Sequence, residues 1–413
     1  MRGSSEVKET HDVIKGYDAE GRRQINEYIF LKTLAVGSLC KVKLACLVTD
    51  ESQLFAVKVF SKWQLRKKRE YFRNKEGGGM TYKDQLQNVL MEIAIMKKLQ
   101  HPHLVRLHEV IDDEENDKLY MVMDYCSNGE LLSWNLKTLK FRPFLKGHDH
   151  LSETDIKKYM RHLIRGLHYM HMNNIVHRDI KPQNVLIDGN FKAKLSDFGV
   201  SQLFPGNQEG DDKLSKTEGT YHFMAPECCD PDVESFSGKP VDVWALGVTL
   251  YCMVYNVLPY WDDTEFGLFQ KIHLQELKLC DSRQISPGLK SLLLKMLTKD
   301  PLKRATILEL RMDPWLNEGC KNQLSTEESP SMLSEVTQED LNHAVTPIHT
   351  LVWAKQIGKK WRLQAAQHRG ASGKSQRDGS FSSGGGHGSS EDGGKQGGAG
   401  IDIEKAFGAL RMD

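Results

Sequence analysis

The sequence predicts an α+β fold in which a strand-rich amino-terminal region precedes a larger, mostly helical region. Two patterns support this prediction. From residue 26 the chain carries short apolar runs separated by polar turns, which is typical of strands. Residues 152–173 repeat apolar side chains at helical spacing instead, and a second apolar helix begins near Asp242. The 413 residues are enough for one two-lobed domain with flanking segments.

Composition excludes several classes of partner and compartment. The net charge of +1 gives no indication of a nucleic-acid or membrane partner. We find no apolar run long enough to span a bilayer, no secretory signal and no lipidation motif, so no stable membrane anchor is expected. The eight cysteines are scattered, without metal-ligand spacing or a disulfide framework. These features indicate reduced thiols and a cytoplasmic location.

The most informative stretch, residues 177–199, reads HRDIKPQNVLIDGNFKAKLSDFG. It resembles the catalytic and metal-binding loops of protein kinases, with the charged residues in the same order. The resemblance implies that Asp179 accepts the proton of the substrate hydroxyl and that Lys181 lies near the γ-phosphate of ATP. It also implies that Asn184 and Asp197 hold Mg²⁺, which prefers hard oxygen ligands.

The same resemblance implies a two-lobed protein kinase fold over residues 26–316. A small, mostly antiparallel β lobe would span about 26–123 and a large, mostly α-helical lobe about 127–316, with ATP and Mg²⁺ as cofactors. The polar residues 1–25 are expected to be a mobile lead-in. A pseudokinase scaffold that kept only the fold is an alternative, but every charged residue of the motif is present.

The loop between the first two predicted strands departs from the kinase pattern. Residues 34–42 align with the glycine-rich loop over the phosphates, yet Gly37 is the one glycine left of three, with Ala35 and Cys40 in place of the others. Glycines let backbone amides approach a phosphate without a Cβ in the way. We therefore expect these two side chains to stiffen or lift the loop and to alter nucleotide affinity.

A strand that ends at Lys58 and a helix over residues 90–99 match another family feature. By the resemblance, Lys58 contacts the α- and β-phosphates and Glu92 pairs with it, although Glu92 taken alone reads as a surface residue. The connection between them, residues 61–85, is long and rich in lysine and arginine. Such a charge run is usually a solvated face, and a docking role is the alternative.

Residues 119–126 read as a buried strand that enters the hinge between the lobes. By alignment with the family, Met123 is the gatekeeper, Asp124 and Cys126 supply backbone hydrogen bonds to adenine, and Glu130 binds the ribose. The full set of residues implied to bind the nucleotide is Leu34, Gly37, Val42, Ala56, Lys58, Met123, Asp124, Cys126, Glu130 and Leu186.

Residues 197–227 resemble an activation segment. Thr217 is the expected phosphoacceptor, and Arg178 is the expected cation for its phosphate. Gln202 stands where many phosphorylation-dependent kinases have a basic residue. Nearby carboxylates would repel a phosphate: Glu209, Asp211, Asp212 and Glu218. Phosphorylation would therefore order the loop weakly.

Three family pairings reach the ends of this segment. Thr220 matches a threonine that bonds near the catalytic aspartate and lysine. Asp242 would hold the backbone of the catalytic loop, and Arg304 would pair with Glu227.

Lys181 followed by Pro182 is typical of serine/threonine kinases. Residues 197–201, residues 236–252 and the long insert before Glu92 resemble the calcium/calmodulin-dependent protein kinase kinases, and the likeness covers about residues 26–364. Gln183 and Cys252 stand where arginine-directed kinases carry carboxylates, which disfavours a strongly basophilic enzyme. The resemblance implies downstream kinases as substrates, phosphorylated on activation-loop threonines.

The carboxyl-terminal part contains a basic amphipathic pattern. Within residues 332–368, Trp353, Ile357 and Trp361 share one helical face and are flanked by lysines and an arginine, which suits calmodulin or a membrane surface. The resemblance implies an autoinhibitory segment relieved by calcium-calmodulin. The alternatives are a helix packed on the kinase domain and a calmodulin-independent activator of AMP-activated-type kinases. Residues 369–413 are Gly/Ser-rich and expected to be disordered.

Overall fold

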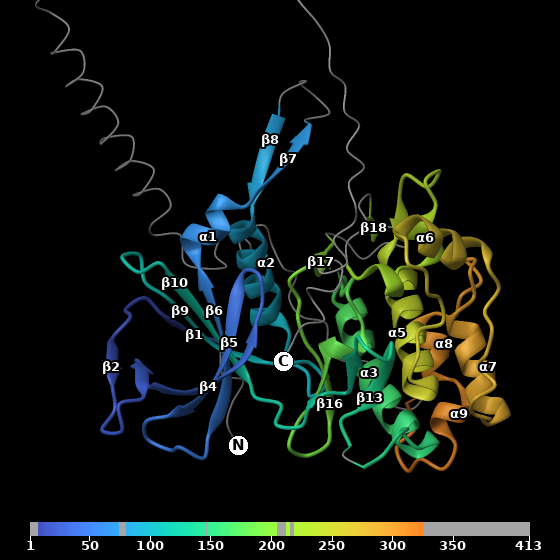
Figure 1. The fold of residues 1–413 in the computed structure, drawn as a ribbon, viewed down its shortest axis with the longest axis horizontal. Helices are drawn as coiled ribbons and strands as arrows, with labels where there is room; N and C mark the ends of the chain where they lie inside the picture. The colour runs from blue at the N-terminus through green and yellow to red at the C-terminus, as the bar shows by residue number, and fades with distance from the viewer. Residues whose placement is uncertain (1–6, 74–79, 146, 205–211, 215–218, 325–413) are drawn as a thin grey trace, which may run out of the picture. The chain divides into compact units, whose positions relative to one another are not determined.

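The computed structural model describes residues 7–73, 80–145, 147–204, 212–214 and 219–324. Strands dominate the chain up to the hinge and helices dominate it afterwards, and the two regions lie side by side in Figure 1. The predicted α+β fold, with a small β lobe followed by a larger helical lobe, is confirmed.

An eight-stranded sheet forms the small lobe among the described residues. All its neighbouring strands are antiparallel except β1 and β9, which are parallel. In sheet order the strands are β1 (Lys8–Thr10), β9 (Leu107–Asp112), β10 (Lys118–Asp124), β6 (Leu54–Ser61), β5 (Cys40–Leu47), β4 (Tyr28–Val36), β3 (Arg23–Ile25) and β2 (Lys15–Tyr17).

The amino-terminal residues differ from the prediction of a mobile lead-in over 1–25. Residues 8–25 supply three short strands, β1, β2 and β3, at the two edges of the sheet. Their sequences are polar because an edge strand is held by backbone hydrogen bonds and leaves much of its side-chain surface in water. Asn26, at a positive φ of 48°, turns the chain between β3 and β4. Residues 1–6 lie outside the described residues.

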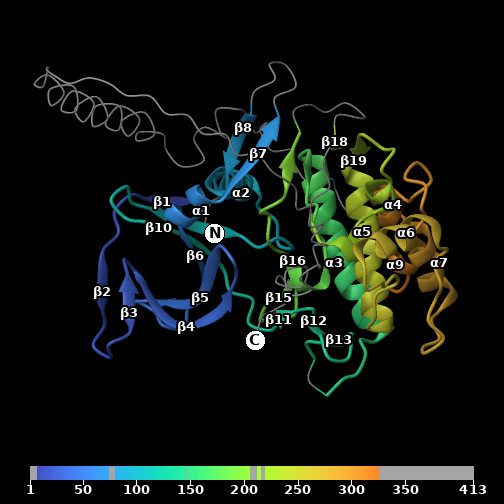
Figure 2. The same cartoon turned by 45° about the horizontal axis from the view of Figure 1, so that its top comes forward.

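The basic insert before Glu92 is ordered into a helix and a hairpin. Helix α1 (Lys62–Lys67) begins at an N-cap serine, Ser61. The hairpin strands β7 (Arg69–Arg73) and β8 (Met80–Asp84) project beyond α1 and α2 (Figures 1 and 2). Asp84 then caps α2 (Gln85–Lys98), which contains Glu92.

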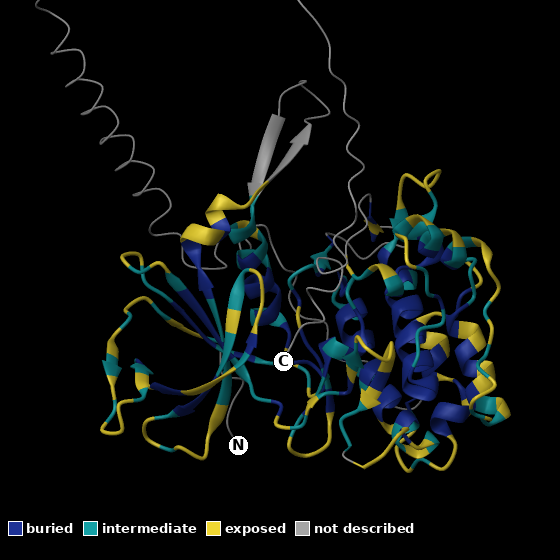
Figure 3. Ribbon diagram, viewed as in Figure 1, coloured by how far each residue is buried: buried dark blue, intermediate teal, exposed yellow. Residues whose placement is uncertain are grey.

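The large lobe is built on two long helices. Helix α3 (Glu153–Met172) begins after its N-cap residue Ser152, whose hydroxyl accepts a hydrogen bond from the Asp155 amide. Helix α5 (Gly238–Tyr255) is buried along almost its whole length, which explains its apolar sequence (Figure 3). The shorter helices around it are α4 (Pro226–Cys229), α6 (Glu265–Leu274), α7 (Pro287–Met296), α8 (Ile307–Arg311) and α9 (Pro314–Asn317).

Short strands in one three-stranded sheet and three pairs support the loops of the large lobe among the described residues. They are β11 (Gly129–Glu130) with β15 (Val185–Ile187) and β16 (Ala193–Leu195), β12 (Leu132–Asn135) with β13 (Lys140–Pro143), β14 (Ile175–Val176) with β17 (Gln202–Leu203), and β18 (Lys213–Leu214) with β19 (Phe236–Ser237). The packed core continues past the predicted end at residue 316, because Leu324 is fully buried. No helix in the described ranges is long and apolar enough to cross a membrane.

Candidate active site

The loop between β14 and β15 is fixed by one buried carboxylate. Asp242, fully buried near the start of α5, accepts hydrogen bonds from the backbone amides of His177 and Arg178, each at 2.8 Å. It also accepts one from the ring of His171, at 2.9 Å. The predicted role of Asp242 in holding this loop is confirmed. The contact of His171, in the last turn of α3, has no signal in the sequence, where His171 looks like one more helix residue.

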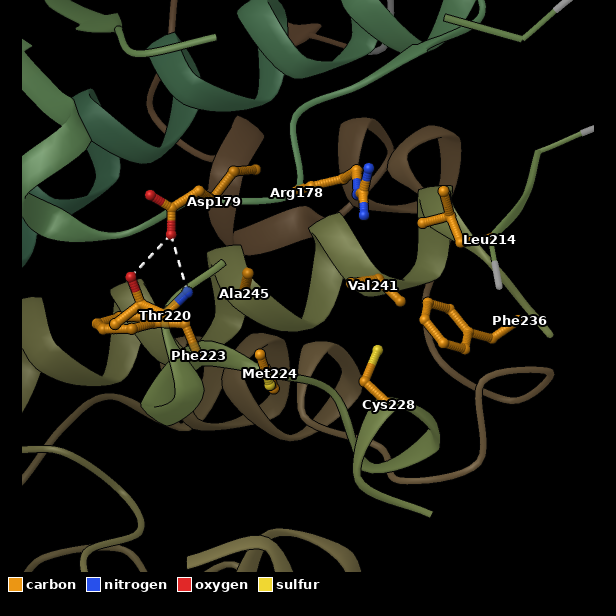
Figure 4. A pocket seen from close by; sticks show the side chains of 11 residues that line it. Arg178, Asp179, Leu214, Thr220, Phe223, Met224, Cys228, Phe236, Val241 and Ala245 are labelled. Carbon is orange, nitrogen blue, oxygen red and sulfur yellow. Dashed lines mark hydrogen bonds between the residues drawn. The ribbon is translucent and has the colours of Figure 1, made fainter. Parts of the chain in front are cut away.

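Asp179 lies at the centre of a hydrogen-bond network, part of which Figure 4 shows. One carboxylate oxygen accepts from the backbone amide and the hydroxyl of Thr220, at 3.1 and 2.8 Å. The other is 2.8 Å from the Lys181 ammonium and 2.9 Å from the Asn184 amide. Lys181 also donates to the Thr220 hydroxyl at 2.8 Å. The structure therefore brings together four residues that the sequence associated.

Gly219 allows this network to form. Its φ is +110°, which side chains disfavour, and a Cβ built there would lie 2.5 Å from the carbonyl oxygen of Arg178. Backbone at that distance cannot give way cheaply, so only glycine lets the chain bring Thr220 to Asp179. Asp179 and Thr220 line a pocket together with mostly apolar side chains, among them Phe223 and Val241 (Figure 4).

Lys58, Glu92 and Asp197 form a second charged cluster. The Lys58 ammonium is 2.8 Å from Glu92 on α2 and 3.3 Å from Asp197. Burial alone would lower the pKa of Lys58, but the two carboxylates outweigh it and raise that pKa, so the side chain stays cationic. The Lys58 charge in turn lowers the pKa of Asp197. The surface alternative for Glu92 is wrong, because the residue is buried.

Asp197 and Asn184 have oxygen atoms of the kind that bind a hard cation. The side chain of Asp197 is half exposed, and its lowered pKa keeps it ionised. The Asn184 amide nitrogen donates to the backbone oxygen of Asp179 at 2.8 Å, which leaves the amide oxygen as the acceptor on the other side. Both groups are oxygen donors of the kind that Mg²⁺ takes, usually together with phosphate oxygens and water. The pair therefore fits the cation that the sequence implied.

The departure from the glycine-rich pattern does not open the β4–β5 hairpin. The Gly37 amide donates to the Cys40 carbonyl at 2.9 Å, and Ala35 pairs with Val42. Ala35 is buried. Burial raises the pKa of the Cys40 thiol, which keeps it neutral. The hairpin thus closes with both substitutions in place.

The residues expected to bind adenine and ribose come from both lobes. Leu34 and Val42 lie in this hairpin, Ala56 lies on β6 and Met123 on β10, whereas Glu130 and Leu186 lie on β11 and β15. Val42 is opposite Lys58, and Ala56 is opposite Met123. A larger group of these positions is partly buried, as for residues lining a cleft: Leu34, Val42, Ala56, Met123, Asp124, Glu130 and Leu186. Cys126 is buried at the hinge, and Glu130 is paired with Leu186. Burial raises the pKa of Glu130 to about 7, against a smaller opposing effect of Lys181.

Asp124 joins the two lobes through its side chain. Its carboxylate lies 2.8 Å from the His108 ring on β9 and 2.9 Å from the Lys194 ammonium on β16. It also accepts a hydrogen bond from the backbone amide of Arg106. Burial opposes ionisation, but these partners win and lower the pKa of Asp124 to about 2. The family resemblance implies a role for the Asp124 backbone, and no local pattern in the sequence predicts these side-chain contacts.

The activation segment is described in part. Thr217, Glu209, Asp211 and Glu218 lie outside the described residues. The Arg178 guanidinium donates to the Gln202 side chain at 3.0 Å. Asp212 differs from its expected position among the loop charges, because it is buried and accepts a hydrogen bond from the Lys239 amide at the start of α5.

Two side chains beside the catalytic loop carry buried polar atoms without a hydrogen-bond partner in the described structure. They are the amide of Gln183 and the indole nitrogen of Trp134. Trp134 stacks on Trp261, with ring centres 6.1 Å apart.

Comparisons with known proteins agree with this geometry. A protein kinase domain model matches residues 28–316. The chain is 36% identical over 374 residues to serine/threonine-protein kinase ssp1 of Schizosaccharomyces pombe, covering 88% of this chain and 54% of the relative. It is 35% identical to the calcium/calmodulin-dependent protein kinase kinase of Caenorhabditis elegans (84% and 63% covered) and to SNF1-activating kinase 1 of Saccharomyces cerevisiae (82% and 32%). The chain spans about half the length of the curated relatives it matches first.

Proposed function

Because this chain belongs to the protein kinase family, and to its serine/threonine branch, we propose that it transfers the γ-phosphoryl group of ATP to threonines in the activation loops of downstream kinases. The observation that carries the proposal is the pair of assembled clusters, one around Asp179 and one around Lys58. Phosphoryl transfer depends mainly on such positioning and charge stabilisation.

Each cluster has a defined task in the proposed reaction. Asp179 accepts the proton as the substrate hydroxyl oxygen bonds to the γ-phosphorus, and the bond to the β-phosphate oxygen breaks to release ADP. Lys181 stabilises the charge on the transferred group, and Lys58, held by Glu92, binds the α- and β-phosphates. Asn184 and Asp197 would hold Mg²⁺, which neutralises phosphate charge when bound.

Two substitutions test the catalytic assignment. Asp179→Asn should remove the proton acceptor and Lys58→Met the phosphate contact, so each should lower turnover by orders of magnitude. Lys290→Met, at an exposed position on α7, is the matched control and should keep full activity. Thermal unfolding should show that all three variants are folded. Retention of most activity by either test variant would refute the assignment, and an inactive natural chain would favour the pseudokinase scaffold.

We further propose that calcium-calmodulin relieves autoinhibition by the segment over residues 332–368, within a cytoplasmic calcium-signalling pathway. The basic face around Trp353, Ile357 and Trp361 supports this proposal, as does the similarity to a relative named as a calcium/calmodulin-dependent protein kinase kinase. These three residues, and Thr217 as the proposed phosphoacceptor, lie outside the described residues. A peptide over residues 348–369 should bind calmodulin only with calcium, and truncation before Val336 should make activity independent of calcium.

A second candidate is a calmodulin-independent activator of AMP-activated-type kinases. The similarity to the yeast protein named SNF1-activating kinase 1 favours it. The two candidates predict different results in one assay, which measures phosphorylation of a downstream kinase domain with and without calcium-calmodulin. Stimulation supports calmodulin control, whereas equal rates support the second candidate. Changing Trp353 and Trp361 to alanine should abolish any stimulation, since large aromatic residues dominate helix-in-groove binding.

A further inference from the structure

The amino-terminal strand β1 is a three-residue addition to one edge of the small-lobe sheet. Lys8, Glu9 and Thr10 pair with Glu109, Val110 and Ile111 of β9, and this is the parallel pair of that sheet. Three residues of ladder give little stability by themselves. Side-chain contacts must therefore hold β1 in place, and they point in two directions because successive residues of a strand face opposite sides.

One set of contacts converges on a buried carboxylate. Glu109 has 1% of its surface exposed, so its charge needs partners. The Tyr28 hydroxyl donates to it at 2.7 Å. The other two partners come from β1, namely the Thr10 hydroxyl and the Lys8 ammonium, the latter at 3.4 Å. These two contacts anchor β1 to Glu109. Without β1, Tyr28 would be the one remaining partner of Glu109 among the described residues.

The other contact reaches helix α2. Glu9 lies 2.7 Å from the ammonium of Lys97, in the last turn of α2. The Lys97 side chain is 17% exposed, whereas Glu9 is an exposed residue of the edge strand with 30% of its side chain exposed. Lys97 is five positions after Glu92, which places it on a different face of the helix. Besides the packing of its buried face, which includes Val89, Ile93 and Met96, helix α2 has two ionic attachments, to Lys58 through Glu92 and to β1 through Lys97. These attachments lie on different faces and add to the restraint on the rotation of the helix.

We propose that β1 is a positioning element for α2 and that Glu9 and Lys97 are positioning residues for Glu92. Without their pair, α2 could turn about its axis, and Glu92 would spend less time within reach of Lys58. Neither residue touches the reacting groups. The activity arm of the test rests on the proposed kinase function, while a structural arm is independent of it.

A charge-reversal cycle tests the proposal in the full-length chain. Glu9→Lys and Lys97→Glu should each lower kcat about three- to tenfold, as expected for loss of a partly buried pair that acts on a catalytic ion pair. The double variant restores an attractive pair and should recover most of the activity, and Lys97→Arg should keep it. Lys32→Glu reverses an exposed charge on β4 and is the matched control.

Hydrogen exchange supplies the structural arm. Each single reversal should speed amide exchange in α2, leave α3 unchanged, and be corrected in the double variant. Normal activity and exchange in the single variants would overturn the proposal, as would loss in the singles without recovery in the double. If the natural chain proved inactive, the proposed function would fail, and exchange in α2 would still decide the role of β1.

Discussion

The pair formed by Arg304 and Glu227 should be the most costly single ion pair to break in the large lobe. Two guanidinium nitrogens each lie 2.7 Å from one carboxylate oxygen, and the side chains are 0% and 7% exposed. The guanidinium also donates to the carbonyls of Pro240, Lys299 and Thr298. The pair ties the end of the activation segment to the loop before α8, as the family pattern predicted.

Glu227→Gln removes the negative charge and keeps the shape. Breaking a buried pair by removing one partner costs about 3–5 kcal/mol, because it leaves an uncompensated buried charge. The glutamine oxygen can still accept one hydrogen bond, so the lower end, about 3 kcal/mol, applies. With about 2 °C per kcal/mol for a domain of this size, Tm should fall by about 6 °C. Scanning calorimetry of the natural and variant chains measures this shift.

A nearby exposed pair provides the control. Lys303 lies 3.2 Å from Asp300, but the two side chains are 80% and 42% exposed, so water screens their attraction. Lys303→Gln should leave Tm unchanged within about 1 °C. Arg304→Lys keeps the positive charge but loses the bidentate geometry, so its decrease in Tm should lie between those of Lys303→Gln and Glu227→Gln. If Glu227→Gln and Lys303→Gln shifted Tm equally, the reasoning from burial would be wrong.

Burial raises the pKa of Glu130 from 4.5 to about 7, so the folded chain holds a proton that the unfolded chain loses. The stability that this proton contributes is present below pH 4.5 and is lost as pH rises toward 7. The Tm of Glu130→Gln minus the Tm of the natural chain should therefore increase between these pH values and stay constant above pH 7. A constant difference would contradict this. Restoring glycine at Ala35 and Cys40 should lower the KM for ATP if their side chains hinder phosphate binding, and an unchanged KM would show that the hairpin tolerates them. Gly219→Ala should lower kcat at least about tenfold, because its Cβ would meet the carbonyl of Arg178; full activity in steady-state assays would rule out that constraint.

The catalytic loop could be predicted because the residues that carry the family resemblance are close together in the sequence. Asp179, Lys181 and Asn184 fall within one short loop, where the structure brings them into contact. The pairing of Lys58 with Glu92 and of Glu227 with Arg304 could be predicted only through the family resemblance. Those partners are far apart along the chain, and no local pattern connects them.

There is a physical reason why the edges of the small lobe could not be predicted from the sequence. Strand β1 has no apolar alternation, since it is held by backbone bonds and by charged partners on β9 and α2. The basic composition of the insert before α2 predicts a solvated face or a docking segment and no regular structure, yet Ser61 and Asp84 cap helices at its two ends. In the sequence Asp212 looks like one more charged loop residue, whereas in the structure its carboxylate accepts a hydrogen bond from the Lys239 amide at the start of α5.

The side-chain contacts of Asp124 have a mechanical consequence for the hinge. The Asp124 carboxylate contacts His108 in the small lobe and Lys194 in the large lobe. Separation of the lobes therefore lengthens at least one of these two contacts. Electrostatic attraction at Asp124 therefore opposes opening of the hinge and favours its return to the closed arrangement. Salt weakens this attraction, though less than for fully exposed charges. The frequency with which the lobes separate, and with it the rate of nucleotide exchange, should therefore rise with ionic strength.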